Sequence, residues 1–301
     1  MLGATLARFP GVVTLPESHF IYETAQMRQK SNTPLAELAD YISAHSRFAA
    51  WRDAGCAPAR YHLKQDLGYR DFLDAMVRDY ARATGVNNVT AFVDHSPRNS
   101  EHVRTLKRTY DDMRFVHIIR DGRAVAASLM PQDWGPNDIL EAAKVWESGV
   151  AAGFAASDYL GGAARNLRFE ALVTGEDATL AAIAAFAGAN SFEQAKEQSS
   201  FRLPGYAGDT HALATKKPSP ERADAWRRRL SARQVELFEH AVGALLELLG
   251  YELVFPRDGA RKASRLERVA IRIKRWASYR RNHERMRARF YASREAQDRR
   301  S

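Results

Sequence analysis

An arginine and a serine eight residues apart are the most informative pair of polar side chains in the sequence. Arg120 directly follows the apolar run Phe115–Ile119, and Ser128 lies in the small-residue segment after Asp121 and Gly122. A guanidinium is planar and permanently charged, so it can hold two oxygens of a terminal phosphate at once. Two helical turns further on, the Ser128 hydroxyl can donate a second hydrogen bond. The pair predicts a phosphate site, and the alternative is an Arg120 that pairs with Asp121 or another carboxylate.

Short apolar runs alternate with helical stretches over residues 1–256, and these elements must position the pair. We expect strands at Val89–Val93, Phe115–Ile119 and Leu167–Phe169, and helices at 36–52, 70–84, 98–110, 122–130, 137–158, 176–187 and 232–248. This order is typical of a mostly parallel sheet covered by helices on both faces. Such sheets bind ligands at the carboxyl ends of their strands, where Arg120 stands. The helix that follows turns unpaired backbone N–H groups towards the same place, which favours an anion.

The segment Arg120–Ser128 has the pattern Arg-Asp-x-Arg-x-Val-x-x-Ser. It resembles the 3′-phosphate-binding motif of sulfotransferases that use 3′-phosphoadenosine-5′-phosphosulfate (PAPS). Further segments resemble this family in the same order, namely Asp94–Asn99, Trp134–Pro136, Leu167–Leu172 and Leu249–Tyr251. The resemblance runs from residue 1 to about 253 and is greatest to bacterial-type members similar to the tyrosylprotein sulfotransferases. This breadth makes it more specific than one motif.

The resemblance implies an α/β fold with a P-loop-NTPase-like parallel sheet flanked by helices over residues 1–256, followed by a basic helical tail at 257–301. It also implies PAPS as co-substrate, a hydroxyl-bearing acceptor and no metal. Arg120 and Ser128 would then bind the 3′-phosphate of the nucleotide. Arg123 is a second candidate cation near the nucleotide, and the alternative is an Arg123 that points to solvent.

Two side chains are candidates for the general base. Glu17, in Leu-Pro-Glu-Ser, resembles the glutamate that serves as base in tyrosylprotein-type members, and a carboxylate suits removal of a hydroxyl proton. The alternative for Glu17 is a carboxylate that stabilises the start of a helix at 18–28. His95 is the second candidate, but the family has a lysine at this position, which favours a structural histidine. We expect Glu17 to be the base.

One family feature is missing from the sequence. Members begin with a strand and a Gly-Thr-Thr loop whose backbone N–H groups bind the 5′-phosphosulfate. Here Met1–Val12 resembles the helix after that loop and the Phe-Pro-Gly corner that follows it. We therefore expect an N-terminally truncated polypeptide with little turnover, because donors of this kind contribute several kcal/mol of transition-state stabilisation.

Composition excludes several classes of protein. The 301 residues are 45% hydrophobic and 27% charged, as in ordinary folded proteins. The single cysteine, Cys56, cannot form an internal disulfide, so we expect a reduced, cytoplasmic protein. No run of apolar residues is long enough to span a membrane, and no signal peptide is visible. The His-Glu-x-x-His pattern and paired cysteines of common metal sites are also missing.

The C-terminal tail holds the positive charge of the chain. The last 45 residues contain 16 Lys/Arg and 5 Asp/Glu, a net charge of +11, so residues 1–256 carry −2 of the total of +9. Apolar residues at near-helical spacing predict an amphipathic basic helix, namely Leu266, Val269, Ile273, Trp276, Met286 and Phe290. Such a helix can dock on the domain, lie on an anionic membrane or bind nucleic acid, of which nucleic acid is the least favoured.

We therefore expect a PAPS-dependent sulfotransferase that is cytoplasmic or peripheral to a membrane. The alternative is an inactive sulfotransferase-like binding module that acts through its basic tail at a membrane or nucleic acid. Binding of adenosine 3′,5′-bisphosphate distinguishes the two.

Overall fold

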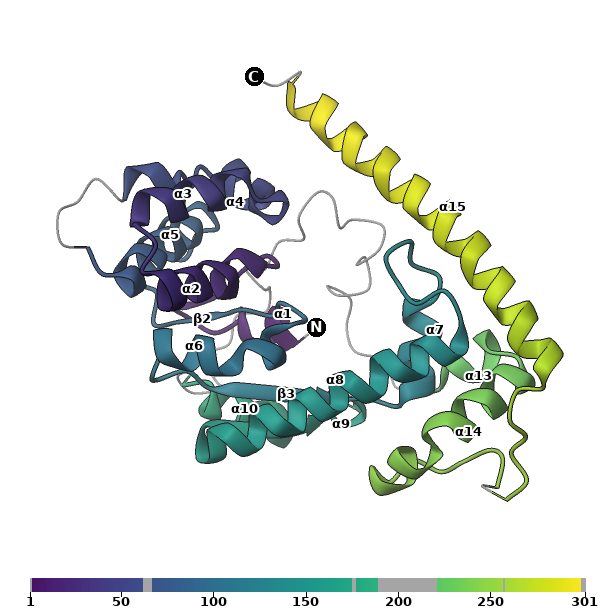
Figure 1. Cartoon of the computed structure of the whole chain (residues 1–301). Coiled ribbons are helices and arrows are strands. Elements are labelled where there is room, and N and C mark those ends of the chain that lie inside the picture. Colours follow the sequence, from purple (N-terminus) through teal and green to yellow (C-terminus); the bar gives the residue numbers. More distant parts are fainter. Residues whose placement is uncertain (1, 62–66, 175–176, 189–220, 257, 299–301) are drawn as a thin grey trace. The chain divides into compact units, whose positions relative to one another are not determined.

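The computed structural model describes residues 2–61, 67–174, 177–188, 221–256 and 258–298 (Figure 1). They fall into two compact units. Unit 1 lies within Met1–His117, Ala155–Arg165 and Gly175–Pro218, and unit 2 within Ile118–Phe154, Asn166–Thr174 and Ser219–Ser301. Within the described residues, no helix combines the length and the apolar character that crossing a bilayer requires.

Unit 1 is built from short helices around a parallel pair of strands. Its helices are α1 (Leu2–Leu6), α2 (His19–Ser31), α3 (Leu35–Ala44), α4 (Ala49–Asp53), α5 (Tyr69–Ala83), α6 (Val103–Thr109) and α10 (Asp177–Phe186). Short 3-10 helices occupy Ser46–Phe48, Pro58–Arg60 and Asn99–His102. Strand β1 (Val12–Thr14) pairs in parallel with β2 (Ala91–Val93), with Val12 opposite Ala91 and Thr14 opposite Val93. Both strands therefore end at the same edge.

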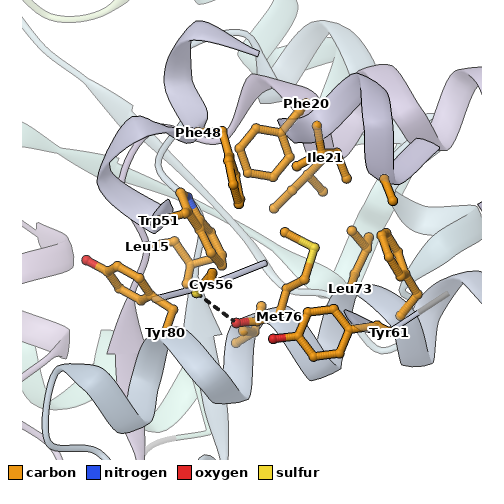
Figure 2. Close-up of a cluster of buried hydrophobic side chains, with 14 of the residues drawn as sticks. Leu15, Phe20, Ile21, Phe48, Trp51, Cys56, Tyr61, Leu73, Met76 and Tyr80 are labelled. Carbon is orange, nitrogen blue, oxygen red and sulfur yellow. Dashed lines mark hydrogen bonds between the residues drawn. The ribbon is translucent and has the colours of Figure 1, made fainter. Parts of the chain in front are cut away.

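Large aromatic side chains fill the core of unit 1 (Figure 2). Phe20 of α2 meets Phe48 and Trp51 edge to face, with ring centroids 5.9 and 5.7 Å apart. Cys56 lies in the same cluster, and burial raises the pKa of its thiol to about 12. The cysteine is thus a packing residue that stays protonated at neutral pH.

Unit 2 carries the turn of interest. Its elements are α7 (Gly122–Leu129), α9 (Phe169–Thr174), α12 (Glu221–Asp224), α13 (Trp226–Arg229), α14 (Ala232–Leu248) and α15 (Arg265–Asp298). Strands β3 (Phe115–Ile119) and β4 (Ala164–Arg168) are neighbours in a second two-stranded sheet. Helix α8 (Ile139–Leu160), β3 and β4 each have residues in both units, and a 3-10 helix at Gly161–Ala163 joins α8 to β4.

The expected α/β class is confirmed, with small parallel sheets in place of one continuous sheet in the part of the chain described. The strand at Phe115–Ile119 has the expected bounds, whereas β1 was not predicted because three residues are too few to show a pattern. The helix expected at 36–52 is divided into α3, the 3-10 helix at Ser46–Phe48 and α4, since His45 is extended (φ −70°, ψ 134°) and ends α3. The strand expected at Leu167–Phe169 lies earlier, at Ala164–Arg168.

Candidate functional site

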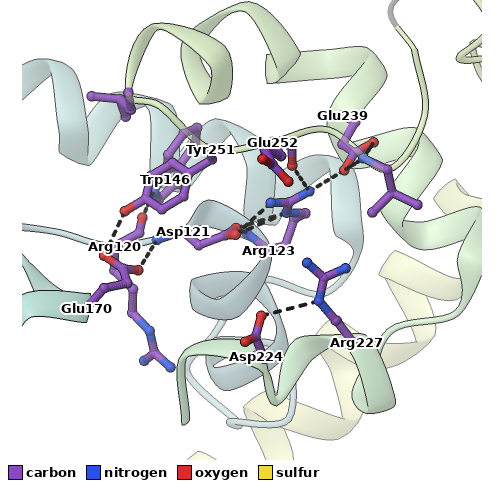
Figure 3. Close-up of polar contacts among 12 residues, drawn as sticks. Arg120, Asp121, Arg123, Trp146, Glu170, Asp224, Arg227, Glu239, Tyr251 and Glu252 are labelled. Atoms are coloured by element: carbon purple, nitrogen blue, oxygen red, sulfur yellow. Dashed lines mark hydrogen bonds and ion pairs between the residues drawn. The ribbon is translucent and has the colours of Figure 1, made fainter. Parts of the chain in front are cut away.

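The turn between β3 and α7 is held by a tryptophan from α8. Trp146 Nε1 donates a hydrogen bond to the carbonyl oxygen of Arg120 at 3.0 Å (Figure 3). Gly122 allows this approach, because a Cβ there would lie 2.5 Å from Trp146 Cδ2 and 2.7 Å from Phe238 Cζ. Both rings belong to the buried cluster of unit 2. The backbone of Arg120 is therefore fixed by packing at the carboxyl end of a strand.

Glu170 joins this turn to the end of β4. Its Oε1 accepts a hydrogen bond from the Asp121 backbone N–H at 3.3 Å, and its Oε2 accepts one from the Tyr251 hydroxyl at 3.1 Å (Figure 3). Burial and the nearby Glu170 raise the pKa of Tyr251, so the phenol remains a neutral donor. One carboxylate thus links the residues that follow both strands to the chain segment after α14.

The Arg120 side chain lies against an aromatic ring. Its guanidinium carbon is 4.1 Å from the centroid of the Phe169 ring, the first residue of α9. Figure 3 shows the side chain running away from Asp121 and Arg123. Stacking on an aromatic face restricts the orientation of a guanidinium. The Phe169 ring therefore orients the Arg120 side chain beside the ends of β3 and β4.

The N-terminus of α7 differs from the expectation of unpaired N–H groups that await an anion. Asp121 is its N-cap, and Asp121 Oδ1 accepts a hydrogen bond from the Arg123 backbone N–H at 2.8 Å. A carboxylate already accepts a hydrogen bond from one backbone N–H of this helix end and places negative charge there. This negative charge makes the terminus of α7 a weaker anion site than expected, so side chains have to supply most of the attraction for an anion bound here.

Arg123 is an interior residue, with its side chain only 2% exposed. Its guanidinium pairs with Asp121 at 2.7 Å and with Glu239 at 2.5 Å, and it donates to the Glu252 carbonyl oxygen at 2.9 Å (Figure 3). It also lies 4.2 Å from the centroid of the Trp226 ring. Burial opposes its charge, but the two carboxylates raise the Arg123 pKa. Arg123 therefore points into the interior rather than to solvent, and at least four of its five N–H donors are used within unit 2, which argues against a role in nucleotide binding.

Ser128 lies in the last turn of α7 and is exposed. The structure thus places Arg120 before α7 and Ser128 near its end, both in unit 2. Two helical turns separate them, as the spacing predicts.

Glu17 lies in unit 1, between the end of β1 and the start of α2. Ser18 fixes the turn around it: its backbone N–H donates to Ser96 Oγ at 2.8 Å, and its hydroxyl donates to the Pro16 carbonyl oxygen at 2.5 Å. The Glu17 carboxylate is 22% exposed and lies 3.0 Å from Arg47 Nη1. Glu17 is therefore a partly exposed carboxylate oriented by a cation, and it lies outside α2.

Two further titratable groups follow the strands of unit 1: His19 begins α2 after β1, and Asp94 directly follows β2. The buried Nε2 of His19 and the buried Oδ2 of Asp94 have no hydrogen-bond partner among the described residues. Burial, followed by the charge of Arg47, lowers the pKa of His19, whereas burial raises the pKa of Asp94. Asp94 Oδ1 accepts a hydrogen bond from the Ser96 hydroxyl, and that hydroxyl oxygen in turn accepts one from the Ser18 backbone N–H.

These groups were only partly predictable. Asp94 belongs to a segment that the resemblance singled out, and His19 lies two residues after Glu17, whereas no sequence signal marks Arg47. His95, the second candidate base, is exposed beside them.

Two hollows on the described surface lie elsewhere. One is lined by residues before β1 and β2, including Pro10 and Asn88, and the other by residues around Lys107 and Phe186. Neither contains Arg120, Ser128 or Glu17. The predicted site residues are therefore identified by their chemistry and their place at strand ends.

Comparison with known proteins identifies the family to which the chain belongs. A model of the sulfotransferase family matches residues 1–194. The sulfotransferase domain from the curacin biosynthetic pathway is similar in fold, with a TM-score of 0.56 at 15% identity over 84% of this chain and 93% of that one. The sulfotransferase domain of the Synechococcus PCC 7002 olefin synthase gives 0.56 at 19% identity over 84% and 90%. No curated protein sequence matches significantly. Because the family model covers more than half of the sequence, this chain belongs to the sulfotransferase family.

Proposed function

We propose that this protein transfers a sulfuryl group from PAPS to a hydroxyl-bearing acceptor. PAPS supplies the activated sulfuryl group, and adenosine 3′,5′-bisphosphate is the leaving nucleotide. Transfers of this kind depend on positioning and on neutralising charge. The tasks left to this chain are to hold the nucleotide and to accept the proton of the acceptor.

The 3′-phosphate is assigned to Arg120 and Ser128. The observation that carries this assignment is the Arg120 guanidinium, oriented by the Phe169 ring at 4.1 Å at the carboxyl end of β3. Side-chain donors matter for the fit, because Asp121 at the N-cap of α7 places negative charge at that helix end. A forked cation and an exposed hydroxyl are side-chain types that donate hydrogen bonds to a phosphate.

The role of general base, which accepts the proton of the acceptor hydroxyl, is assigned to Glu17. Its carboxylate accepts the acceptor's hydroxyl proton as the new oxygen–sulfur bond forms, and Arg47 at 3.0 Å keeps the carboxylate in place. His19 Nε2 and Asp94 Oδ2, in the same unit, are buried polar atoms without a hydrogen-bond partner among the described residues. Glu17→Gln removes the proton acceptor while it keeps the size of the side chain, so it should abolish turnover and leave nucleotide binding unchanged.

Binding is the first test, since residues 1–301 contain no Gly-Thr-Thr loop. Isothermal titration with adenosine 3′,5′-bisphosphate should show affinity that falls about 10- to 100-fold in Arg120→Ala, as expected for lost hydrogen bonds to a charged group. The matched control is Arg227→Ala, which removes another unit 2 arginine stacked on an aromatic ring, 4.5 Å from the Trp226 centroid. It should bind normally.

Adenosine 5′-monophosphate, which has no 3′-phosphate, separates a specific role from a general loss of charge. Arg120→Ala should not change its affinity. If Arg120→Ala weakens both nucleotides equally, or weakens neither, Arg120 does not bind the 3′-phosphate.

A further inference from the structure

Helix α15 contacts unit 2 through a polar stripe. Glu267 pairs with Arg233 of α14 at 2.8 Å, Arg275 pairs with Asp138, and Asn282 Nδ2 donates to Asn137 Oδ1 at 3.2 Å. Two more residues complete the stripe: Ser278 is buried, and Ile271 packs against the hydrophobic cluster of unit 2. The five residues recur every three or four positions and so share one face of the helix.

The apolar residues of α15 lie on its other face and are exposed. Leu266 is 83% exposed, Val269 55%, Ile273 63% and Trp276 61%. We call these four residues the outer stripe. At 3.6 residues per turn, the centre of the outer stripe lies roughly 180° from the centre of the polar stripe. Met286 and Phe290, expected to continue the apolar pattern, lie beyond the side chains that the structure describes.

This arrangement reverses the usual one. A surface helix normally buries its apolar stripe and exposes its charges, because burial of apolar area stabilises the fold. Here ion pairs and hydrogen bonds hold the helix, and four large apolar side chains remain in contact with solvent. A contiguous apolar patch of this kind marks a surface for a partner or a membrane.

The charges beside the outer stripe identify its partner. On an ideal helix, Arg265 and Arg272 flank it on one side and Lys274 and Arg281 on the other, and all four are exposed. Arg280 lies in line with the stripe, its guanidinium carbon 5.0 Å from the centroid of the Trp276 ring. The partner surface must therefore be apolar inside and negatively charged at its rim.

A bilayer with anionic headgroups has both properties. We propose that α15 lies in the plane of an anionic lipid surface, with the outer stripe in the acyl boundary and the flanking cations among the headgroups. Trp276 and Tyr279, which is 60% exposed, are residue types that favour this interface. Lipid contact thus uses a face of α15 that docking on unit 2 leaves open.

A second copy of the chain is the main competing partner. The outer stripe has the 3-4-3 spacing of a coiled-coil seam, but Arg280 and His283 fall at the next two seam positions. Two heptads are fewer than a stable coiled coil needs. Arginines beside both seams would also repel each other. The same charges that disfavour pairing favour an anionic surface.

The test is co-sedimentation of the whole chain with vesicles. One set is phosphatidylcholine alone, and the other also contains about 30 mol% phosphatidylserine, whose negative surface potential attracts basic segments. The chain should bind the anionic set, bind the neutral set at least about tenfold more weakly, and be released from the anionic set by high salt.

The variant Ile273→Glu places a carboxylate in the outer stripe and changes no residue of the polar stripe. It should weaken binding to anionic vesicles at least about tenfold. The matched control is Leu248→Glu, the same kind of change at an apolar residue that is 81% exposed on α14, and it should bind like the unaltered chain. Far-UV circular dichroism checks that both variants fold.

Three outcomes would overturn the proposal. The first is equal binding to neutral and anionic vesicles. The second is an equal loss of vesicle binding in Ile273→Glu and Leu248→Glu. The third is a chain that does not bind vesicles and that sedimentation velocity shows to be a dimer, which Ile273→Glu dissociates.

Discussion

Replacing Arg123 distinguishes an interior arginine from a nucleotide-binding one. Its guanidinium has two carboxylates, one carbonyl oxygen and the Trp226 ring as neighbours, and the side chain of Glu239 is fully buried. In Arg123→Ala, the buried carboxylates of Asp121 and Glu239 lose the cation that neutralises them. Removal of one partner of a buried ion pair is costly because the remaining charge cannot reach water.

The expected loss is about 3–5 kcal/mol of unfolding free energy. Glu239 keeps its bonds to the backbone N–H groups of Val254 and Phe255, which places the loss towards the lower end of that range. Small domains are stable by about 5–15 kcal/mol, so the variant should remain folded but unfold at a much lower urea concentration. Arg123→Lys should cost less than Arg123→Ala, since it keeps the charge without the fork.

Urea unfolding followed by circular dichroism measures this loss, and Arg227→Ala is its control. Arg227 stacks on the same Trp226 ring at 4.5 Å, but its ion pair with Asp224 is exposed. Exposed pairs contribute at most about 1 kcal/mol, so the control should shift the midpoint little. An Arg123→Ala chain with an unchanged midpoint and weaker binding of adenosine 3′,5′-bisphosphate would refute the assignment of Arg123 to the interior.

Three further predictions follow from packing and from shifted pKa values. Gly122→Ala should lower the free energy of unfolding by about 1–3 kcal/mol, because the added Cβ would overlap the Trp146 ring. Gly149→Ala on α8, with open space around its Cβ, should instead stabilise the helix by about 0.5–1 kcal/mol. The urea midpoints of the two variants measure the difference. Native Cys56 should resist a thiol reagent at pH 8 because burial raises its pKa to about 12, and fast labelling without denaturant would contradict this. Burial lowers the pKa of His19 below 6.5 in the folded chain, so on acidification the unfolded chain binds a proton at this residue first, and the free energy of unfolding falls as the pH drops below 6.5. His19→Gln should reduce that fall. The same dependence of stability on pH in the variant and the unaltered chain would contradict this prediction.

Local pattern was enough to locate the turn that carries Arg120. The apolar run Phe115–Ile119 and the Asp-Gly break after it predict a strand, a turn and a helix, and β3 and α7 lie there. Periodicity also predicts the helix of the tail, because the spacing of apolar residues depends only on helical geometry. Position along an element is a short-range property, and the sequence contains it directly.

The direction in which each charged side chain points was decided by tertiary contacts. Arg123 pairs with Glu239, which is 116 positions away, and no local pattern relates two such residues. The same reason explains α15: spacing shows which of its residues share a face, but the partners Asp138 and Arg233 determine which face is docked. Burial of apolar area alone would place the apolar stripe of α15 inside, but ion pairs with residues distant in the sequence hold the opposite face against unit 2.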